Sequence, residues 1–140
     1  MSLSDLYRDY NDQVKFAVIY IREAHPLDGW QYGDISTVHD PKTIEERRKL
    51  ASQCDSAMKH GIKTYVDKMD NEVMIQYCAY PERLYLIKTD GTVAYPGAPG
   101  PSGFSPKELK EAIDKVLKEE GKQVQPDKAD SGKADSGDQK

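Results

Sequence analysis

The sequence predicts one α/β domain over residues 1–121, and three observations support this prediction. Residues 14–21, VKFAVIYI, form an apolar run whose length and β-branched and aromatic side chains favour a buried strand. Two stretches, at about 42–60 and 106–120, have helical spacing of apolar residues. Residues 83–95 have the pattern of a hairpin with an Asp-Gly turn. Strands that alternate with helices in this way are typical of an α/β domain.

A short helix is expected before the first strand. Ser4 is a candidate N-cap, and Asn11 and Asp12 break the helical pattern. Four apolar or aromatic residues fall at helical spacing: Leu3, Leu6, Tyr7 and Tyr10.

The second helix is expected after a loop at residues 31–40. Asp40 followed by Pro41 resembles an N-cap and a first helical position, and Thr43 and Glu46 offer a capping box one turn later. Gly61 is the expected residue just past the helix end at about His60. The predicted apolar face consists of Ile44, Leu50, Ala51, Cys54, Ala57 and Met58.

The second half of the domain is expected to contain three further elements before its last helix. They are a strand at 62–66, a short helix at 72–77 after a polar turn, and a hairpin of strands 83–87 and 93–95. Ser105, Pro106 and Glu108 then supply an N-cap, a first-turn proline and an acidic third position. The predicted apolar face of this last helix consists of Leu109, Ala112, Ile113, Val116 and Leu117.

Composition excludes several classes of protein. The net charge of −4 and the pI of about 5.4 give no reason to expect binding to nucleic acid or an anionic membrane. No apolar run is long enough to span a bilayer, and no signal-peptide pattern opens the chain. Cys54 and Cys78 do not form a disulfide framework of the secreted kind, so a cytoplasmic location is expected.

Residues 122–140 differ in composition from the domain. The pentapeptide KADSG occurs twice, and Val124 is the only sizeable apolar side chain. Such a segment cannot bury enough apolar surface to offset its ordering entropy, which predicts a disordered tail of unknown role.

The residues that follow the first strand suggest a site. Glu23 and His25 are two apart, so an extended chain would direct both side chains to one face. Pro26 and Gly29 favour a turn, and Trp30 adds a large aromatic surface. Ligands of open α/β sheets bind at the carboxyl ends of the strands, which is where this group is expected.

This stretch also resembles a known family. IYIREAHPLDGW, residues 19–30, resembles the VYIEEAHxSDGW signature of the iodothyronine deiodinases, and KMDNEVMIQY resembles their RMDNNxxIAY segment. PERLYLIKTDGTVAYPGAPGP resembles the strand-turn-strand that contains a family arginine. The resemblance, from about Leu3 to Leu117, implies a thioredoxin-like sheet with flanking helices, whose first strand and nucleophile loop are absent from this sequence.

The resemblance further implies reductive deiodination of iodothyronines or similar iodinated phenols. In that reaction a selenolate or thiolate takes the iodine and a proton replaces it, with an external thiol as reductant and no metal or cofactor. Glu23 and His25 would relay protons, Arg83 would pair with the anionic end of the substrate, and Trp30 would line the pocket.

Each assignment has a simpler alternative. His25 could be a loop residue bonded to nearby backbone, and Arg83 could pair on the surface with Glu82 or Glu72. Trp30 could serve packing, and His39 is interpreted as a solvated loop residue because its spacing does not match a family histidine.

Neither cysteine has the features that lower a thiol pKa. Cys54 lies on the predicted apolar helix face, and Cys78 lies at the end of a short helix; neither belongs to a CxxC pair. A nucleophilic role is therefore not favoured for either, with Cys78 ahead of Cys54.

Two functions remain open. The first is a deiodinase-like oxidoreductase domain, inactive without an upstream nucleophile because the GSxT-U/C-PPF motif has no counterpart here. The second is a non-catalytic thioredoxin-like module that binds a protein or a small aromatic ligand. The strands at 14–21 and 83–87 would each lack a partner, so they must pair directly, borrow a strand from another molecule or remain marginally stable. Of these alternatives we expect self-association through the open strand edges.

Overall fold

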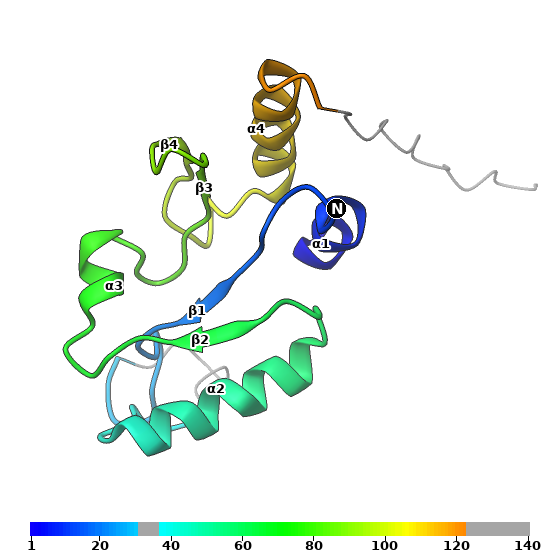
Figure 1. Ribbon diagram of the computed structural model, residues 1–140. Coiled ribbons are helices and arrows are strands. Elements are labelled where there is room, and N and C mark those ends of the chain that lie inside the picture. Colours follow the sequence, from blue (N-terminus) through cyan, green and yellow to red (C-terminus); the bar gives the residue numbers. More distant parts are fainter. Residues whose placement is uncertain (31–36, 123–140) are drawn as a thin grey trace, which may run out of the picture.

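The structure is a computed structural model that describes residues 1–30 and 37–122. The expected tail after residue 122 and most of the expected loop at 31–40 lie outside these residues. The described elements, shown in Figure 1, are α1 (Leu3–Tyr10), β1 (Val18–Tyr20), α2 (Ile44–Met58), β2 (Thr64–Val66), α3 (Glu72–Gln76), β3 (Tyr85–Ile87), β4 (Val93–Pro96) and α4 (Pro106–Glu119).

The predicted α/β class with flanking helices is confirmed, but the strands form two small sheets rather than one. β1 pairs in parallel with β2, and β3 pairs antiparallel with β4, as the hairpin pattern predicts. Direct pairing of the first strand with β3, one of the three alternatives, does not occur, because β1 and β3 lie in separate sheets of the described chain.

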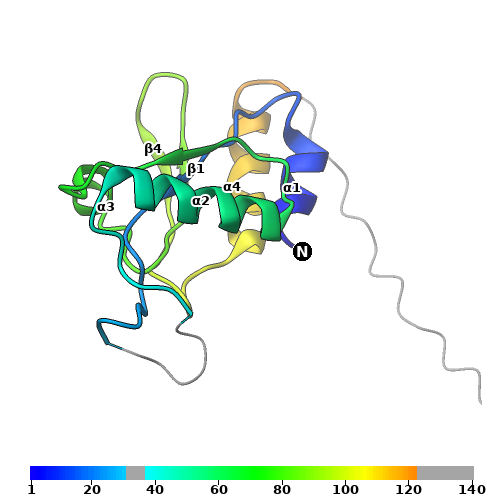
Figure 2. The same ribbon diagram turned by 90° about the horizontal axis from the view of Figure 1, so that it is seen from below.

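The β1–β2 sheet is covered by α2 on one face and open on the other. The Thr64 hydroxyl donates to Asp55 of α2 at 2.7 Å, and Figure 2 shows α2 crossing in front of both strands. Ile19 and Tyr65 are paired in register and remain 43% and 48% exposed. The prediction of a buried strand over 14–21 is therefore wrong in two respects, because the strand is limited to β1 and its middle side chain faces outward.

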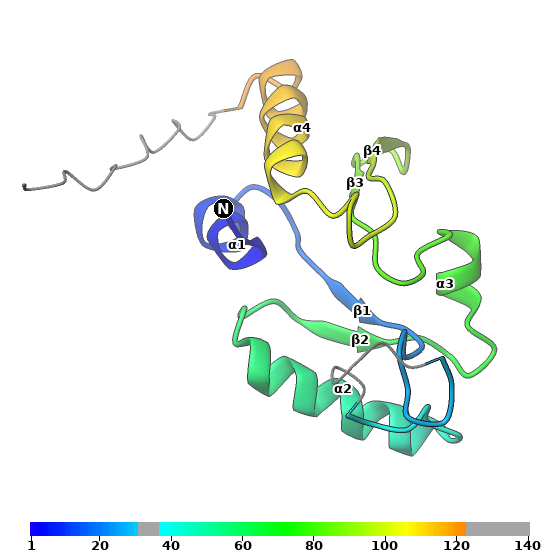
Figure 3. The ribbon, with the colours of Figure 1, turned by 180° about the vertical axis from the view of Figure 1, so that it is seen from behind.

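The apolar core lies on the other side of the molecule, where α4 packs against α1 and the hairpin. In Figure 3, α1 lies between α4 and the connection from α2 to β2. The predicted apolar face of α4 is confirmed by the burial of three of its residues and the partial burial of the other two. The core cluster consists of Leu6, Tyr10, Leu86, Leu109, Ile113 and Leu117.

The cap of α4 was predicted correctly and that of α1 was not. The Ser105 side chain accepts from the Glu108 amide, and Pro106 opens α4. At α1, the N-cap is Ser2 rather than Ser4, because Ser2 and Asp5 form a reciprocal capping box.

The start and end of α2 also differ from the first expectation. Thr43 and Glu46 form the capping box, and Asp40 does not cap, because its backbone amide donates to Asp28 and its carboxylate pairs with Arg22. The helix ends at Lys59, which adopts the left-handed conformation at φ 48°, so Gly61 is not its first residue past the end.

The predicted apolar face of α2 is confirmed in part, because Ile44, Leu50 and Cys54 are half-buried but Ala57 is exposed. Arg47 and Ala51 are its buried residues, at 2% and 3% exposure, whereas Met58 is 59% exposed. The side of α2 that faces the sheet is therefore held in part by a charged group, whose partners are described below.

Candidate functional site

The segment that follows β1 bends as soon as the strand ends. The Tyr20 carbonyl accepts from the Asp67 amide at 2.9 Å, and the chain then bends at Arg22 and at Ala24–His25. Because the backbone is not extended across Glu23–His25, their two-residue spacing does not by itself place both side chains on one face.

Glu23 lies half-buried on the side of the segment that faces α2. Burial raises the pKa of its carboxyl, the nearby Asp40 carboxylate raises it further, and the Arg47 guanidinium opposes both effects. The same carboxylate also raises the pKa of Cys54 on α2, which places Glu23 close to that helix.

Arg47 joins α2 to the turn between β2 and α3. Its Nη1 donates to the Lys68 carbonyl at 2.6 Å and to the Asp67 carbonyl at 3.4 Å. The buried Asp67 carboxylate in turn accepts from the backbone amides of Lys68, Val73 and Met74, which fixes the start of α3. Since the Asp67 amide is also bonded to β1, one buried network fixes the strand end from which Glu23 projects.

His25 and Trp30 form an aromatic pair. Their ring centroids are 4.8 Å apart with an interplanar angle of 54°. Trp30 is 69% exposed, so it packs against His25 at the surface and not in the core. The pair instead presents a half-buried imidazole beside a solvent-exposed indole face.

Arg83 is fixed by backbone carbonyls of two neighbouring segments. Its Nε donates to the Gly97 carbonyl at 2.5 Å and its Nη1 to the Cys78 carbonyl at 3.3 Å, and its guanidinium lies 5.2 Å from the centre of the Tyr85 ring. The alternative that Arg83 pairs with Glu82 or Glu72 finds no support in these contacts, and Glu72 pairs with Lys68.

Tyr80 connects the two segments that contain the predicted site residues. Its hydroxyl donates to the Ala24 carbonyl at 2.9 Å, between Glu23 and His25, and Tyr80 is three residues before Arg83. The structure thus brings the segment of His25 beside the segment of Arg83. The contacts of Glu23 lie toward α2 and those of Arg83 toward the hairpin, so the convergence of the three side chains on one pocket stays a prediction.

The cysteines lie in different surroundings. Cys54 is partly buried with its Sγ 3.7 Å from Met58 Sδ, and burial is the main cause that raises its pKa, followed by the Glu23 and Asp55 carboxylates. Cys78 is exposed and has a left-handed backbone at φ 47°. A raised thiol pKa reduces the thiolate fraction, which disfavours Cys54 as a nucleophile.

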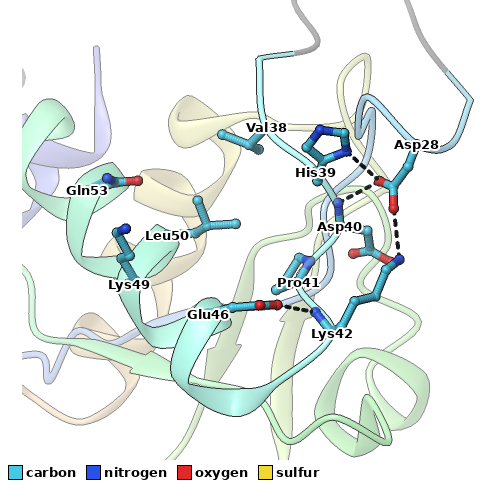
Figure 4. A pocket seen from close by; sticks show the side chains of 10 residues that line it. All are labelled: Asp28, Val38, His39, Asp40, Pro41, Lys42, Glu46, Lys49, Leu50 and Gln53. Atoms are coloured by element: carbon cyan, nitrogen blue, oxygen red, sulfur yellow. Dashed lines mark hydrogen bonds and ion pairs between the residues drawn. The ribbon is translucent and has the colours of Figure 1, made fainter.

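A pocket of about 540 Å³ lies between α2 and residues 38–42, and Asp28 from the segment after β1 also lines it (Figure 4). Asp28 bonds to the wall formed by residues 38–42, accepting from the Asp40 amide at 2.7 Å and pairing with Lys42 at 2.9 Å. These bonds lower the pKa of Asp28 to about 2, the Lys42 bond most strongly. His39, interpreted from the sequence as a solvated residue, lies 3.8 Å from Asp28 and is 73% exposed.

Comparison with known proteins identifies the family. The sequence pattern of the family described as iodothyronine deiodinase matches residues 2–117. The chain belongs to the iodothyronine deiodinase family. Among its relatives is the thyroxine 5-deiodinase of Sparus aurata, 41% identical over 101 residues, which are 72% of this chain and 38% of the relative. Those of Rattus norvegicus and Homo sapiens are each 37% identical over 110 residues, which are 75% of this chain and 34% of each relative.

The chain thus spans about a third of the length of the deiodinases that it matches. Within the described residues, no cluster of three metal-ligating side chains occurs, and no helix is long and apolar enough to cross a membrane.

Three residues of the candidate site were missed by sequence reasoning. Arg47, Asp67 and Tyr80 connect the segments of the predicted residues, yet none was singled out for a role. Asp67 begins the predicted polar turn, which is a weak signal, whereas nothing local marks Arg47 as buried.

Proposed function

We propose that this chain is a thioredoxin-like domain of a deiodinase-type oxidoreductase, in which His25, Trp30 and Arg83 bind an iodinated or related phenol. The observation that supports this most directly is the Tyr80–Ala24 hydrogen bond, which holds the two segments with these residues side by side. The family match covers both segments.

The aromatic pair provides a surface for the ring of the substrate. An aromatic ring binds favourably against an exposed indole face, and the neighbouring imidazole of His25 can donate to or accept from a phenol oxygen. Arg83 is held through Nε and Nη1, and no hydrogen bond in the described part of the chain uses Nη2. A carboxylate of the substrate can therefore bind Nη2 without displacing the existing bonds.

Glu23 is suited to a proton relay with His25. Its pKa is raised above that of an ordinary glutamate, mainly by burial, which favours the protonated form that a proton donor requires. In the proposed reaction the carbon–iodine bond breaks, the iodine passes to a selenolate or thiolate, and a proton takes its place on the ring. An external dithiol then supplies two electrons and releases iodide.

The nucleophile of this reaction is not assigned to either cysteine. Cys54 has a raised pKa, and Cys78 has its Sγ 3.7 Å from the Ile75 carbonyl on an exposed turn. We therefore expect residues 1–140 to bind an iodinated phenol but to release no iodide on their own.

Binding and turnover can be measured on the same sample. Trp30 is the only tryptophan and is exposed, so 3,5-diiodotyrosine should quench its fluorescence saturably. His25→Ala should weaken that binding about tenfold, the effect of losing one hydrogen bond of roughly 1.4 kcal/mol, whereas His39→Ala should not. Equal binding by both histidine variants would refute the proposed site.

Iodide release with excess dithiol tests the chemistry. Turnover that survives combined Cys54→Ser and Cys78→Ser substitution would contradict a thiol or selenol mechanism. Turnover lost only in Cys78→Ser would assign the nucleophile to that residue. Sequencing the coding DNA upstream of Met1 separates the oxidoreductase from a non-catalytic binding module, since an in-frame cysteine or UGA codon before a PPF-like sequence favours the enzyme.

The non-catalytic module, with a protein or small aromatic ligand, is the second candidate. It is favoured by the surroundings of the two cysteines, neither of which has a feature that activates a thiol. Self-association is expected with either function. Among the described residues, β1 and β3 each pair with one other strand, and the side chains of Ile19 and Tyr65 are exposed. Sedimentation should therefore show a concentration-dependent dimer, and a monomer at all concentrations would refute this expectation.

A further inference from the structure

We propose that the pocket between α2 and residues 38–42 binds a small aromatic carboxylate. This proposal does not rest on the proposed deiodination, because none of the residues that line the pocket belongs to the His25, Trp30 and Arg83 group. The argument rests on which polar groups of the pocket are already bonded within the protein and which are not.

Most carboxylate oxygens of the pocket are bonded within the protein or buried. Asp28 is bonded to the Asp40 amide and to Lys42, and Glu46 accepts from the backbone amides of Lys42 and Thr43. One oxygen of Asp40 pairs with Arg22 at 3.4 Å, and its other oxygen is buried away from solvent. A ligand that brings further donors would therefore find few carboxylate oxygens available to accept them.

Two side chains of the pocket have donors that are available to a ligand. Lys49 and Gln53 project from successive turns of α2 along one side of the pocket, as Figure 4 shows. In the part of the chain that the structure describes, no hydrogen bond or ion pair engages either side chain. An ammonium and an amide at this spacing can bind the two oxygens of one carboxylate.

The remainder of the pocket is apolar. Val38 and the buried Pro41 contribute one wall, and Leu50 projects from α2 between Lys49 and Gln53. A volume of about 540 Å³ lies within the usual range for small-molecule sites. The ligand that matches this lining has a flat apolar body and one anionic end.

The structure also fixes the shape of the pocket without a ligand. Asp28 bonds to the 38–42 segment through both of its oxygens, and the Leu27 amide donates to the Val38 carbonyl at 2.8 Å. The strong lowering of the Asp28 pKa, caused first by Lys42, means that this bridge persists across the ordinary pH range. The wall opposite α2 is therefore held in place before a ligand binds.

The probe is 3-phenylpropionate, compared with the neutral 3-phenyl-1-propanol by amide NMR titration of the full chain. The carboxylate should saturably shift the amides of Val38, Leu50 and Gln53. It should bind about threefold to fivefold more tightly than the alcohol, because an exposed ion pair contributes up to about 1 kcal/mol.

The variant Lys49→Met tests whether the ammonium is responsible. Lys49→Met should weaken carboxylate binding about threefold to fivefold and leave alcohol binding unchanged. The control Arg48→Met removes one charge from the same helix outside the pocket lining, and it should change the affinity for neither ligand. Equal affinities for acid and alcohol, an equal effect of both variants, or shifts confined to Trp30 and its neighbours would each overturn the proposal. The absence of saturable shifts up to the solubility limit would do the same.

Discussion

The two halves of the molecule are held together by different physical means. The half formed by α1, α4 and the β3–β4 hairpin has a continuous apolar core, in which Leu6, Ile113 and Tyr10 are at most 1% exposed. The half formed by β1, β2 and α2 buries Ala51 and Ile62 but also Arg47 and His60. Its strands and helix are therefore joined largely by hydrogen bonds to charged groups.

This difference explains where the candidate site lies. The predicted site residues follow β1 or precede β3, at the boundary between the two halves, where Tyr80 joins Ala24. A polar network such as that of Arg47 and Asp67 fixes positions through directed bonds, whereas an apolar core contributes most of the free energy of folding. We infer that the α4 half supports the fold and the α2 half fixes the site.

The largest effect is expected from a cavity in the apolar half. Ile113→Ala should lower the free energy of unfolding by about 3 kcal/mol, because Ile113 is 1% exposed within the core cluster. Urea denaturation followed by circular dichroism measures this change. Glu111→Ala, at an exposed position of the same helix, is the control and should change stability little. A loss below 1 kcal/mol for Ile113→Ala would show that this core is not well packed.

The next largest loss of stability is expected from removing the charge of Arg47, which is buried in the half formed by β1, β2 and α2. Arg47→Met keeps the apolar stem but leaves the carbonyls of Asp67 and Lys68 without their donor, so we expect a loss of about 2 kcal/mol. Arg48→Met removes an exposed charge from the neighbouring position and should have almost no effect. If Arg47→Met were as stable as the parent, apolar contacts rather than hydrogen bonds would hold α2 in place.

A smaller effect tests a buried polar contact that joins α1 to α4. The Tyr10 hydroxyl donates to Asp114 at 2.6 Å, and burial, with a further contribution from Asp114, raises the Tyr10 pKa to about 12. Tyr10→Phe should cost about 1.5 kcal/mol, less than a core cavity, because Asp114 keeps its 2.7 Å bond to Lys110. Tyr65→Phe on the exposed sheet face is the matched control. Equal losses in the two variants would contradict a specific role for the Tyr10 hydroxyl.

The sequence predicted the apolar half well because local patterns suffice there. The spacing of Leu109, Ile113 and Leu117 and the cap at Ser105 specify α4, and the Asp-Gly turn specifies the hairpin. For α2 the same reasoning missed the buried Arg47, because its burial depends on two carbonyls about twenty residues away. No local periodicity indicates such a partner.

The candidate site, like the fold, could be predicted only in part from the sequence. The motif residues His25 and Trp30 and the later Arg83 could be named from the sequence, and Tyr80 brings their segments together. The position of Glu23 against α2 could not be predicted, because the chain bends directly after Arg22 and extended-strand alternation no longer applies.

A weaker effect concerns the pH dependence contributed by Glu23. Its folded-state pKa is raised, so the folded protein binds the proton more tightly than the unfolded chain does, and stability falls as pH rises through the range between the two pKa values. Glu23→Gln should remove this decline and leave the protein no less stable at neutral pH. Because the carboxyl is about half exposed, the change should be smaller than that of Tyr10→Phe. Urea midpoints measured from pH 4 to 8 test the direction, and Glu45→Gln, an exposed site on α2, is the control.

The smallest effect is expected where the predicted apolar face of α2 proved wrong. Met58 is 59% exposed in the last turn of the helix, and its sulfur lies 3.7 Å from the Cys54 sulfur. Met58→Lys removes little buried surface and places a positive charge near the carboxyl end of the helix dipole, which is favourable. We therefore expect the free energy of unfolding to stay within about 0.5 kcal/mol of the parent value. Leu109→Lys, at a 5% exposed position of α4, should by contrast prevent folding or nearly so. A loss of more than 2 kcal/mol for Met58→Lys would mean that an apolar surface covers the end of α2 in solution, and the contrast between the two halves would then be weaker than the structure indicates.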